Sequence, residues 1–313
     1  RPLWELLVVP GATATGPGVI LRLHHCVSDG VGAVSLVGHL FGADAQPAHP
    51  SGGQAHTQPR RPEPGRPRPG GRSRLRMLVT GAARVTAVFR ATVPRTVLLG
   101  PIGRHRGVAL VDAPLAPLAA AARARDATVN DVLLAAVAGA VEATLRADGR
   151  PVPDVLPASV PVALPERGSS VNAVGVMLAP LLTGVDYIGQ RVSRIAAVTR
   201  TAKDEARAQG TFELTRSRWG SRAFAWLARR QRFVAVFVTN VRGPSRRMHL
   251  AGAPLLRAWP VAPIQGNVRF GVAAMSYDGR LGVAVHVDAD ALRADVAGRA
   301  LEAELRRAVE RDV

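Results

Sequence analysis

The chain has 313 residues, with an apolar share of 47%, an aromatic share of 4% and a formal net charge of +18. This length and apolar share allow a sizeable core and favour two domains over one. Because aromatic residues are few, Leu, Val and Ala must form most of that core. The single cysteine, Cys26, excludes an intrachain disulfide and fits a reducing cytoplasm. No apolar run reaches the roughly 18 residues that a membrane span needs.

The positive charge raises the hypothesis of a nucleic-acid partner, which the rest of the sequence does not favour. Of the 41 basic residues, all but Lys203 are arginine, a bias that a high-GC genome explains more simply than a tuned binding face. The sequence has no zinc-ligand spacing, no aromatic RNA-binding signature and no helix-turn-helix pattern. We therefore expect neither a nucleic-acid partner nor a bound metal.

The first informative element is a strand that ends in two histidines. Residues 19–25 read VILRLHH, and alternation places Leu23 and His25 on one face but Arg22 and His24 on the other. Apolar residues then recur over residues 30–41 at the spacing of a helix that buries one face. The segment predicts a strand, a tight turn and a helix.

The turn carries the candidate chemistry, in the motif HHCVSDG at residues 24–30. His25 continues an apolar face, and imidazole, with a reference pKa of roughly 6.5, suits a general base near neutral pH. Asp29 is placed to hold the loop or the ring, and Gly30 allows backbone geometry that a Cβ forbids. Two alternatives remain open: that these are ordinary residues at a strand end, and that Cys26 is a nucleophile, although a free cysteine is usually a small buried hydrophobe.

A linker is predicted next, at about residues 45–74. Residues 59–76 hold seven arginines against one glutamate, among Pro and Gly residues that cannot form a packed element. We expect this stretch to be disordered and solvated. Its charge would still attract the phosphates of coenzyme A and anionic lipid surfaces.

A long helix is predicted after the linker. Thr128 followed by Asp131 forms a capping-box-like start, an apolar stripe follows, and Gly149 provides the stop. Asn130 and Asp131 then lie in the first helical turn, where exposed N–H groups favour negative charge. We predict a capping role for Asp131, whereas capping and function both remain open for Asn130.

A basic, aromatic-rich segment follows at residues 211–238. It holds six of the chain's thirteen aromatic residues, and residues 216–232 contain six arginines and no acid. A helix of this composition is typical of a segment at a membrane or lipid-droplet surface. The alternative is an amphipathic core helix with a solvated arginine face. The next residues, 239–244, read TNVRGP and predict a strand end that enters a Gly-Pro turn.

Several blocks of the sequence resemble the bacterial wax ester synthase/acyl-CoA:diacylglycerol acyltransferase family. RPLWELLVVPG at residues 1–11 and LRLHHCVSDGVG at residues 21–32 resemble the family's PLW and HHxxxDG segments. Further blocks resemble the family in the family's own order, at residues 126–141, 159–185, 237–264 and 275–292.

The resemblance implies an α/β fold of two chloramphenicol-acetyltransferase-like lobes of the condensation-domain superfamily, with mixed β-sheets and a tunnel between the lobes. Residues 1–95 would form a partial first lobe and residues 96–313 the second. It also implies that His25 deprotonates the acceptor hydroxyl as that hydroxyl attacks the acyl-CoA thioester. His24 and Asp29 would complete the catalytic motif, and Asn130 would face the tunnel.

The implied reaction moves a long-chain acyl group from acyl-CoA, the co-substrate, to a fatty alcohol or diacylglycerol, without a further cofactor. The enzyme would be cytoplasmic, with peripheral contact at the inner membrane or lipid droplets. The alternatives are another acyltransferase of the superfamily and a catalytically inactive fragment that binds lipid surfaces. Two departures accompany the resemblance. The chain opens at the PLW block without Met, so we expect an N-terminal truncation, and Leu99 stands where the family leads us to expect Asn.

Overall fold

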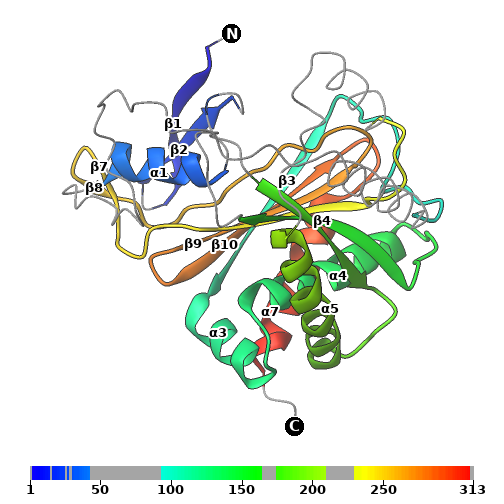
Figure 1. Ribbon diagram of the computed structural model, residues 1–313. Coiled ribbons are helices and arrows are strands. Elements are labelled where there is room, and N and C mark those ends of the chain that lie inside the picture. Colours follow the sequence, from blue (N-terminus) through cyan, green and yellow to red (C-terminus); the bar gives the residue numbers. More distant parts are fainter. Residues whose placement is uncertain are drawn as a thin grey trace, which may run out of the picture.

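The computed structural model describes residues 2–14, 16–24, 27, 30–42, 93–163, 174–208 and 229–310. Two regions of the described chain differ in size and packing (Figure 1). A small first region holds β1, β2 and α1, and a large second region holds the remaining elements. The predicted linker at about residues 45–74 lies outside the described residues.

The first region is a hairpin followed by a helix. β1 (Trp4–Thr13) and β2 (Gly16–Leu23) pair antiparallel, and α1 (Gly30–Phe41) follows the turn. The predicted order of strand, turn and helix is confirmed, with β2 ending two residues before the predicted end. The described part of this region is antiparallel, so the mixed sheet predicted for both lobes is found in the second region.

The second region is built on a six-stranded mixed sheet with strand order β3-β10-β9-β6-β4-β5. β6 runs parallel to both β4 and β9, and the other neighbouring strands pair antiparallel. A short arm, β7 with β8, leaves the chain between β6 and β9. The strands are β3 (Arg106–Pro114), β4 (Val155–Ala163), β5 (Val174–Leu182), β6 (Val236–Arg242), β7 (His249–Leu250), β8 (Ala253–Pro254), β9 (Phe270–Tyr277) and β10 (Arg280–Asp288).

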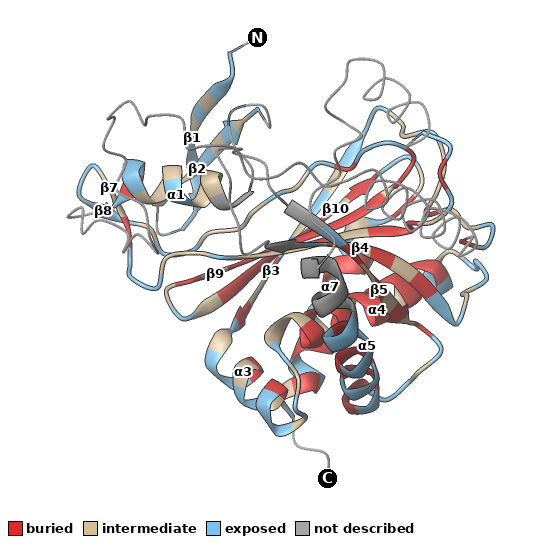
Figure 2. Cartoon of the chain, viewed as in Figure 1, coloured by how far each residue is buried: buried red, intermediate tan, exposed pale blue. Residues whose placement is uncertain are grey.

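Four of the described helices cover one face of this sheet, below it in Figure 1. They are α3 (Leu115–Ala124), α4 (Val129–Ala147), α5 (Ile188–Ala208) and α7 (Ala294–Val309). Figure 2 shows buried residues concentrated in α4 and along the sheet. The core beneath the helices consists mainly of Leu, Val and Ala, with Phe270 as the aromatic among its buried members, so the expectation from the low aromatic content is confirmed.

Both predicted ends of α4 are present. The Thr128 Oγ1 accepts a hydrogen bond from the Asp131 N–H, and an Asp131 carboxylate oxygen accepts one from the Thr128 N–H at 2.8 Å, which is a capping box. Asp131 is 2% exposed and also accepts a 2.6 Å hydrogen bond from the Thr199 hydroxyl of α5. The helix ends at Ala147, just before Gly149, whose φ of 62° is the left-handed conformation that favours glycine.

A buried ion network links the helices, and no local sequence pattern indicates it. The Arg191 side chain on α5 is 2% exposed and donates to Glu304 on α7 at 3.0 Å and to the Ala135 carbonyl of α4 at 3.1 Å. Glu142 on α4 lies 3.5 Å from the same guanidinium. Burial raises the pKa of Glu142, although Arg146 and Arg191 oppose that shift.

The described residues hold neither a helix that could span a membrane nor a metal-ligand cluster. No single described helix combines the necessary length with an apolar composition. α3 and α4 reach the length and apolar composition of a membrane span only when they are taken together, and the two helices are bent by 97° relative to each other. No group of three or more His, Cys, Asp or Glu residues in the described ranges is arranged to hold a metal ion.

Candidate active site

The motif lies between β2 and α1, and the structure describes its two ends. The His24 side chain is exposed, and its backbone N–H donates to the Leu3 carbonyl at 2.8 Å, which extends the hairpin pairing by one residue. The Val27 N–H donates to the His24 carbonyl at 2.9 Å and closes a turn. Gly30 is the first residue of α1. His25 and Asp29 lie outside the described residues, so their roles stay predictions.

The two faces of β2 differ in the sense expected for the histidine pair. Leu21 and Leu23 are half-buried, whereas Arg22 and His24 between and after them are exposed. Leu21 packs near Phe41 of α1 and near side chains of the second region. Strand alternation predicts that His25, which lies outside the described residues, shares the face of Leu21 and Leu23 and is opposite to His24.

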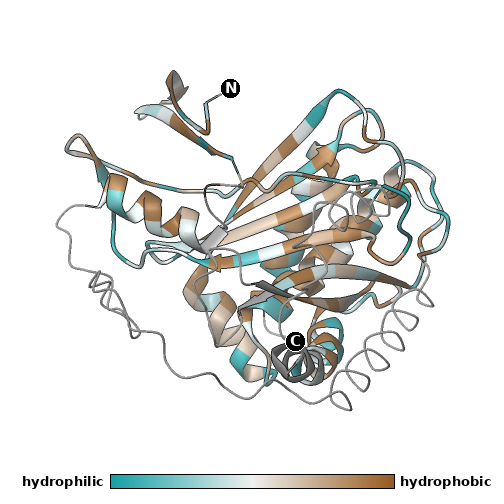
Figure 3. Cartoon of the chain, turned by 45° about the horizontal axis from the view of Figure 1, so that its top comes forward, coloured by the Kyte–Doolittle hydropathy of each residue, from teal (hydrophilic) through white to brown (hydrophobic). Residues whose placement is uncertain are grey.

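The second region presents a sheet face opposite its four helices, which we call the open face. Along β6, Val236 and Val238 are fully buried under the helices, so Phe237 and Thr239 point to the open face. Phe237 pairs with Ser159 of β4, which pairs in turn with Leu178 of β5. These four side chains are half-buried, and Figure 3 shows hydrophobic residues along the strands. The open face is therefore a partly apolar wall with small hydroxyl groups.

A strap formed by residues 255–264 covers the other half of the open face, over β9 and β10. The strap approaches so closely that a Cβ on Gly282 would lie 2.1 Å from the Ala258 carbonyl oxygen. The His286 ring hydrogen-bonds through Nδ1 to the Ala262 carbonyl at 2.8 Å, so that nitrogen carries the proton. Within the described ranges, the strap does not extend over the β6, β4 and β5 half of the wall, which we call the uncovered strip.

Helix α1 lies at one end of this wall. It contacts β6 and β7, and its last residue, Phe41, packs with Tyr277, which alternation along β9 places on the open face. The two elements that flank the motif therefore dock on the same sheet face as the uncovered apolar strip. This arrangement brings β2 and α1, the elements that flank the motif, to the same side of the sheet as the partly apolar wall.

Asn130 and Asp131 are on the other side of the sheet. Figure 1 places α4 below the sheet and α1 above its end. Asn130 is half-buried in the first turn of α4, while the Asp131 carboxylate is occupied by the cap and by Thr199. The described residues thus show a structural role for Asp131, and a tunnel-facing role for Asn130 stays a prediction.

Two models of one protein family match the chain in sequence. The wax ester synthase/diacylglycerol acyltransferase catalytic domain matches residues 1–133, and the C-terminal domain of the same family matches residues 171–307. The chain belongs to the wax ester synthase/diacylglycerol acyltransferase (WS/DGAT) family. The suspected resemblance is confirmed.

Curated relatives agree with this assignment. A putative diacylglycerol O-acyltransferase of Mycobacterium tuberculosis is 28% identical over 328 residues, covering 91% of this chain and 62% of the relative. A putative diacylglycerol O-acyltransferase of Mycobacterium bovis is 34% identical over 221 residues, covering 66% of this chain and 49% of the relative. The chain thus spans 62% of the length of the first of these WS/DGAT relatives and 49% of the second.

Solved structures support the fold. The wax ester synthase/diacylglycerol acyltransferase of Marinobacter aquaeolei has a TM-score of 0.69 at 23% identity, with 98% of this chain and 71% of that chain covered. The trichothecene 15-O-acetyltransferase TRI3 of Fusarium sporotrichioides has a TM-score of 0.61 at 11% identity, with 99% and 70% covered. The α/β acyltransferase fold expected for a WS/DGAT chain is confirmed, whereas the boundary between residues 1–95 and 96–313 stays a prediction.

Leu99, the departure from the WS/DGAT pattern noted in the sequence, has a structural place. It forms an isolated antiparallel bridge with Val268 and packs against the core of the second region. The following Gly100 N–H donates to the Asn267 carbonyl at 2.9 Å. A leucine at this position serves packing, and its described contacts do not include the described ends of the motif.

The basic aromatic segment needs one correction. Its first part falls among residues 209–228, outside the described residues, so a lipid-facing helix there stays a prediction. The last residues of the segment are not helical: residues 229–235 form turns and irregular backbone, and β6 begins at Val236. The run VAVFV alternates in a sheet because Val236 and Val238 face the core while Phe237 faces the open side. The predicted strand end before the Gly-Pro turn is confirmed.

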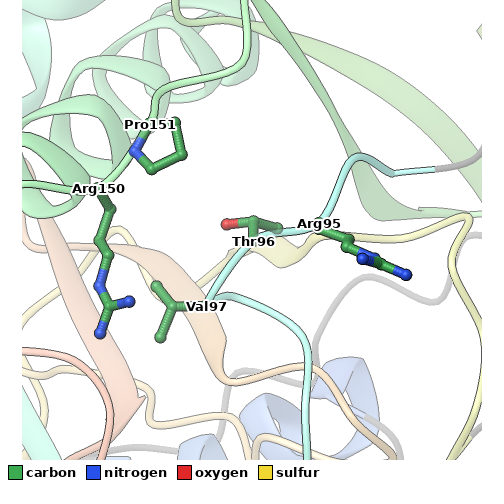
Figure 4. Close-up of a pocket in the computed structure, with 5 residues that line it drawn as sticks. All are labelled: Arg95, Thr96, Val97, Arg150 and Pro151. Carbon is green, nitrogen blue, oxygen red and sulfur yellow. The ribbon is translucent and has the colours of Figure 1, made fainter.

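A surface cavity of about 370 Å³ lies elsewhere, between residues 95–97 and the loop after α4. Thr96 and Arg150 line it, together with Pro151. Figure 4 shows the Arg95 side chain directed away from Arg150, so the two guanidinium groups do not converge on one ligand. We assign no role in the WS/DGAT reaction to this cavity.

Sequence reasoning missed the features that hold the motif against the second region. The strap, the β7–β8 arm and the contacts of Tyr277 depend on residues far apart in the chain. The local signals were weak: a Gly in each of the strands β9 and β10 indicates a close backbone approach. Gly282 is one of them, and the strap crosses it.

Proposed function

We propose that the protein is an O-acyltransferase that moves a long-chain acyl group from acyl-CoA to a fatty alcohol or diacylglycerol, giving wax ester or triacylglycerol. The WS/DGAT family match supports acyl transfer, and the relatives named diacylglycerol O-acyltransferases support the acceptor class. The observation that carries the proposal is the docking of the two elements that flank HHxxxDG onto a partly apolar sheet face. Long acyl chains need such a wall, because burying each methylene is worth about 0.8 kcal/mol.

In this proposal, His25 is the general base. Its imidazole takes the proton of the acceptor hydroxyl while the oxygen attacks the thioester carbonyl, and the coenzyme A thiolate leaves and is then protonated. Strand alternation predicts that His25 shares the face of the half-buried Leu21 and Leu23, opposite to the exposed His24. Asp29 precedes Gly30 of α1 and would fix the turn.

The uncovered strip of the open face would hold the acyl chain. Phe237 and Leu178 supply apolar surface, while the small side chains of Ser159 and Thr239 leave room beside them. The net charge of +18 would favour the approach of the coenzyme A phosphates. We also propose cytoplasmic placement with peripheral contact at lipid surfaces, which co-flotation of the protein with anionic vesicles would test.

The decisive experiment is acyl transfer in vitro, followed by lipid chromatography. Radiolabelled acyl-CoA should give labelled wax ester with a fatty alcohol or labelled triacylglycerol with diacylglycerol. His25→Ala should lower turnover by about 10² to 10⁴ while the fold persists, because this is the usual worth of general-base catalysis. Product from an amine acceptor alone would instead indicate another acyltransferase of the superfamily.

His24→Ala is the matched control within the motif. It removes the same side chain from the exposed face and should have the mildest effect on chemistry. Asp29→Ala should reduce both activity and stability, because it leaves its partner unpaired. If His24→Ala abolished turnover and His25→Ala did not, the assignment of the base would be wrong. A chain that folds but transfers no acyl group to any acceptor would indicate an inactive fragment.

A further inference from the structure

The β7–β8 arm is one of the described connections between the elements that flank the motif and the second region, together with the contact of α1 with β6. Met248, at the base of the arm, is 3% exposed and forms a small cluster with Phe41 of α1 and Tyr277 of β9. Leu21 of β2 and Val37 of α1 pack at the rim of the same cluster. One cluster therefore contacts both elements that flank the motif, β2 before it and α1 after it.

The Tyr277 hydroxyl closes the base of the arm. It accepts a hydrogen bond from the Met248 N–H at 2.9 Å and donates one to the Leu255 carbonyl at 2.8 Å. The Leu255 N–H donates directly to the Met248 carbonyl at 2.9 Å. The Tyr277 hydroxyl therefore adds a second connection between Met248, just before β7, and Leu255, just after β8. Tyr277 is 2% exposed, which makes both hydrogen bonds costly to lose.

The neighbours of Tyr277 anchor the approach to the arm as well. The Ser276 hydroxyl accepts a hydrogen bond from the Gly243 N–H at 3.3 Å, and Asp278 pairs with Arg247 at 2.8 Å. Three consecutive residues at the end of β9 thus fix the segment between β6 and β7. Of the three, Tyr277 packs with α1.

We infer that Tyr277 is a positioning residue for acyl transfer: through the arm, it sets the position of β2 and α1, and so of the motif, over the open face. The inference rests on the proposed function for its catalytic consequence. Tyr277 does not act on substrate. Its hydroxyl fixes the arm, the arm supports Phe41 and Leu21, and these two residues belong to the elements that flank the motif, with Phe41 at the end of α1 remote from it.

Tyr277→Phe tests the inference, since it removes the hydroxyl and keeps the ring in the cluster. Turnover, kcat, should fall about tenfold to a hundredfold with little change in KM, because a small displacement of a catalytic group costs rate more than binding. Hydrogen exchange should become faster in α1 and in residues 248–255 but stay unchanged in β3 and β10. A purely structural role would lower the melting temperature without this split between kcat and KM.

The matched control is Tyr187→Phe, the same change at the chain's other tyrosine, which is 50% exposed and lies next to α5. It should leave kcat and the exchange of α1 unchanged. Replacing Tyr277 with p-aminophenylalanine, which retains a donor and an acceptor, should restore most of the lost turnover. If Tyr277→Phe does not fold, Val37→Ala supplies a milder loosening of the same cluster from the α1 side.

The outcomes separate the inference from the proposed function. A wild-type chain without acyl transfer contradicts the proposed function, and the exchange measurement then decides whether Tyr277 fixes α1. An active wild type with unchanged kcat in Tyr277→Phe overturns the inference alone. Lost turnover with unchanged exchange in α1 overturns it too, because the effect would then not pass through the arm.

Discussion

The hairpin of the first region and the sheet of the second region bury their apolar residues to very different extents. Trp4 and Val8 on β1 are 63% and 58% exposed. Ile20 of β2, which lies on the opposite face of the hairpin, is 49% exposed. In the second region, Phe270 and Leu281 are at most 1% exposed. The six-stranded sheet has four helices on one face, whereas neither face of the two-stranded ribbon is fully covered by the described residues.

The difference indicates that the second region supplies most of the stability of the described chain, whereas the proposed chemistry belongs to the motif in the first region. An isolated two-stranded hairpin is marginal in water, so β1 and β2 depend on contacts beyond their own pairing. The described contacts of this kind converge on the cluster of Phe41, Met248 and Tyr277. We expect substitutions in the large core of the second region to change unfolding, and substitutions at this cluster to change turnover more than unfolding.

The largest expected effect compares the same change in the two regions. Phe270→Ala should lower the free energy of unfolding by about 3 to 5 kcal/mol, because the side chain is fully buried in the core. Phe41→Ala should instead detach α1, with faster exchange there and a loss of turnover, while the second region unfolds at nearly the same denaturant concentration. Denaturant titration with circular dichroism measures the first effect and hydrogen exchange the second. Equal destabilisation by both changes would mean that the two regions unfold as one unit.

Arg191→Met should lower the free energy of unfolding by about 3 kcal/mol, which is at the lower end of the range for breaking a buried ion pair. The loss stays at the lower end because Arg146 and Arg307 still contact Glu142 and Glu304. The matched control is Arg194→Met on the exposed side of α5, which should stay within about 0.5 kcal/mol of wild type. Thermal and denaturant unfolding measure both. A small loss for Arg191→Met would show that the helices are held by apolar packing alone.

Thr128→Ala should cost about 1 kcal/mol, since it removes the hydroxyl of the capping box. Asn130→Ala, two residues later, separates capping from chemistry. Reduced turnover in a stable protein would place Asn130 in the substrate tunnel, and a lower melting temperature with unchanged kinetics would restrict it to the helix start. Comparing the two variants in one melting and kinetic series makes the distinction direct.

The smallest expected effect concerns pH. A hydrogen bond from His105, at 2.6 Å, lowers the pKa of Asp290 from its ordinary 3.8. A carboxyl group whose pKa is lowered by folding stabilises the folded state at pH values above its pKa in the unfolded chain. That stabilisation is lost as the pH falls through the pKa of the folded state. Asp290→Asn should therefore flatten the dependence of the melting temperature on pH below about 4. The exposed Asp154→Asn serves as control, and an unchanged acid profile for Asp290→Asn would refute the assignment.

Local patterns predicted the elements that local energetics determine. Two helices show this. The apolar spacing that ends at Phe41 and the cap formed by Thr128 and Asp131 each involve residues only a few positions apart, so the sequence indicated α1 and α4 directly. The histidine pair indicated the strand end, although β2 stops at Leu23. The family resemblance, and not periodicity, supplied the catalytic assignment of His25.

The remaining features depend on partners far apart in the chain. In the sequence, Arg191 cannot be distinguished from the many other arginines, because its partner Glu304 lies far away in the chain, on α7. Tyr277 reads as a strand residue until Met248 and Leu255 fold back over it. Residues 234–238 were predicted to be helical because the aromatic and arginine content of the whole segment outweighed their short apolar alternation. That alternation belongs to a strand, β6, which pairs with β9, as Thr239 does with Ala273.

The strand order also bears on when the protein can fold during its synthesis. β3, the first strand of the large sheet to be translated, pairs with β10, near the end of the chain, with Pro114 opposite Arg280. The sheet edge and the helix α7 that packs on β3 cannot assemble until β10 and α7 have left the ribosome. We expect nascent chains that end before β10 to remain protease-sensitive and to need chaperone protection. Ribosome-bound chains of increasing length, probed by brief proteolysis, should gain resistance only after β10 and α7 emerge.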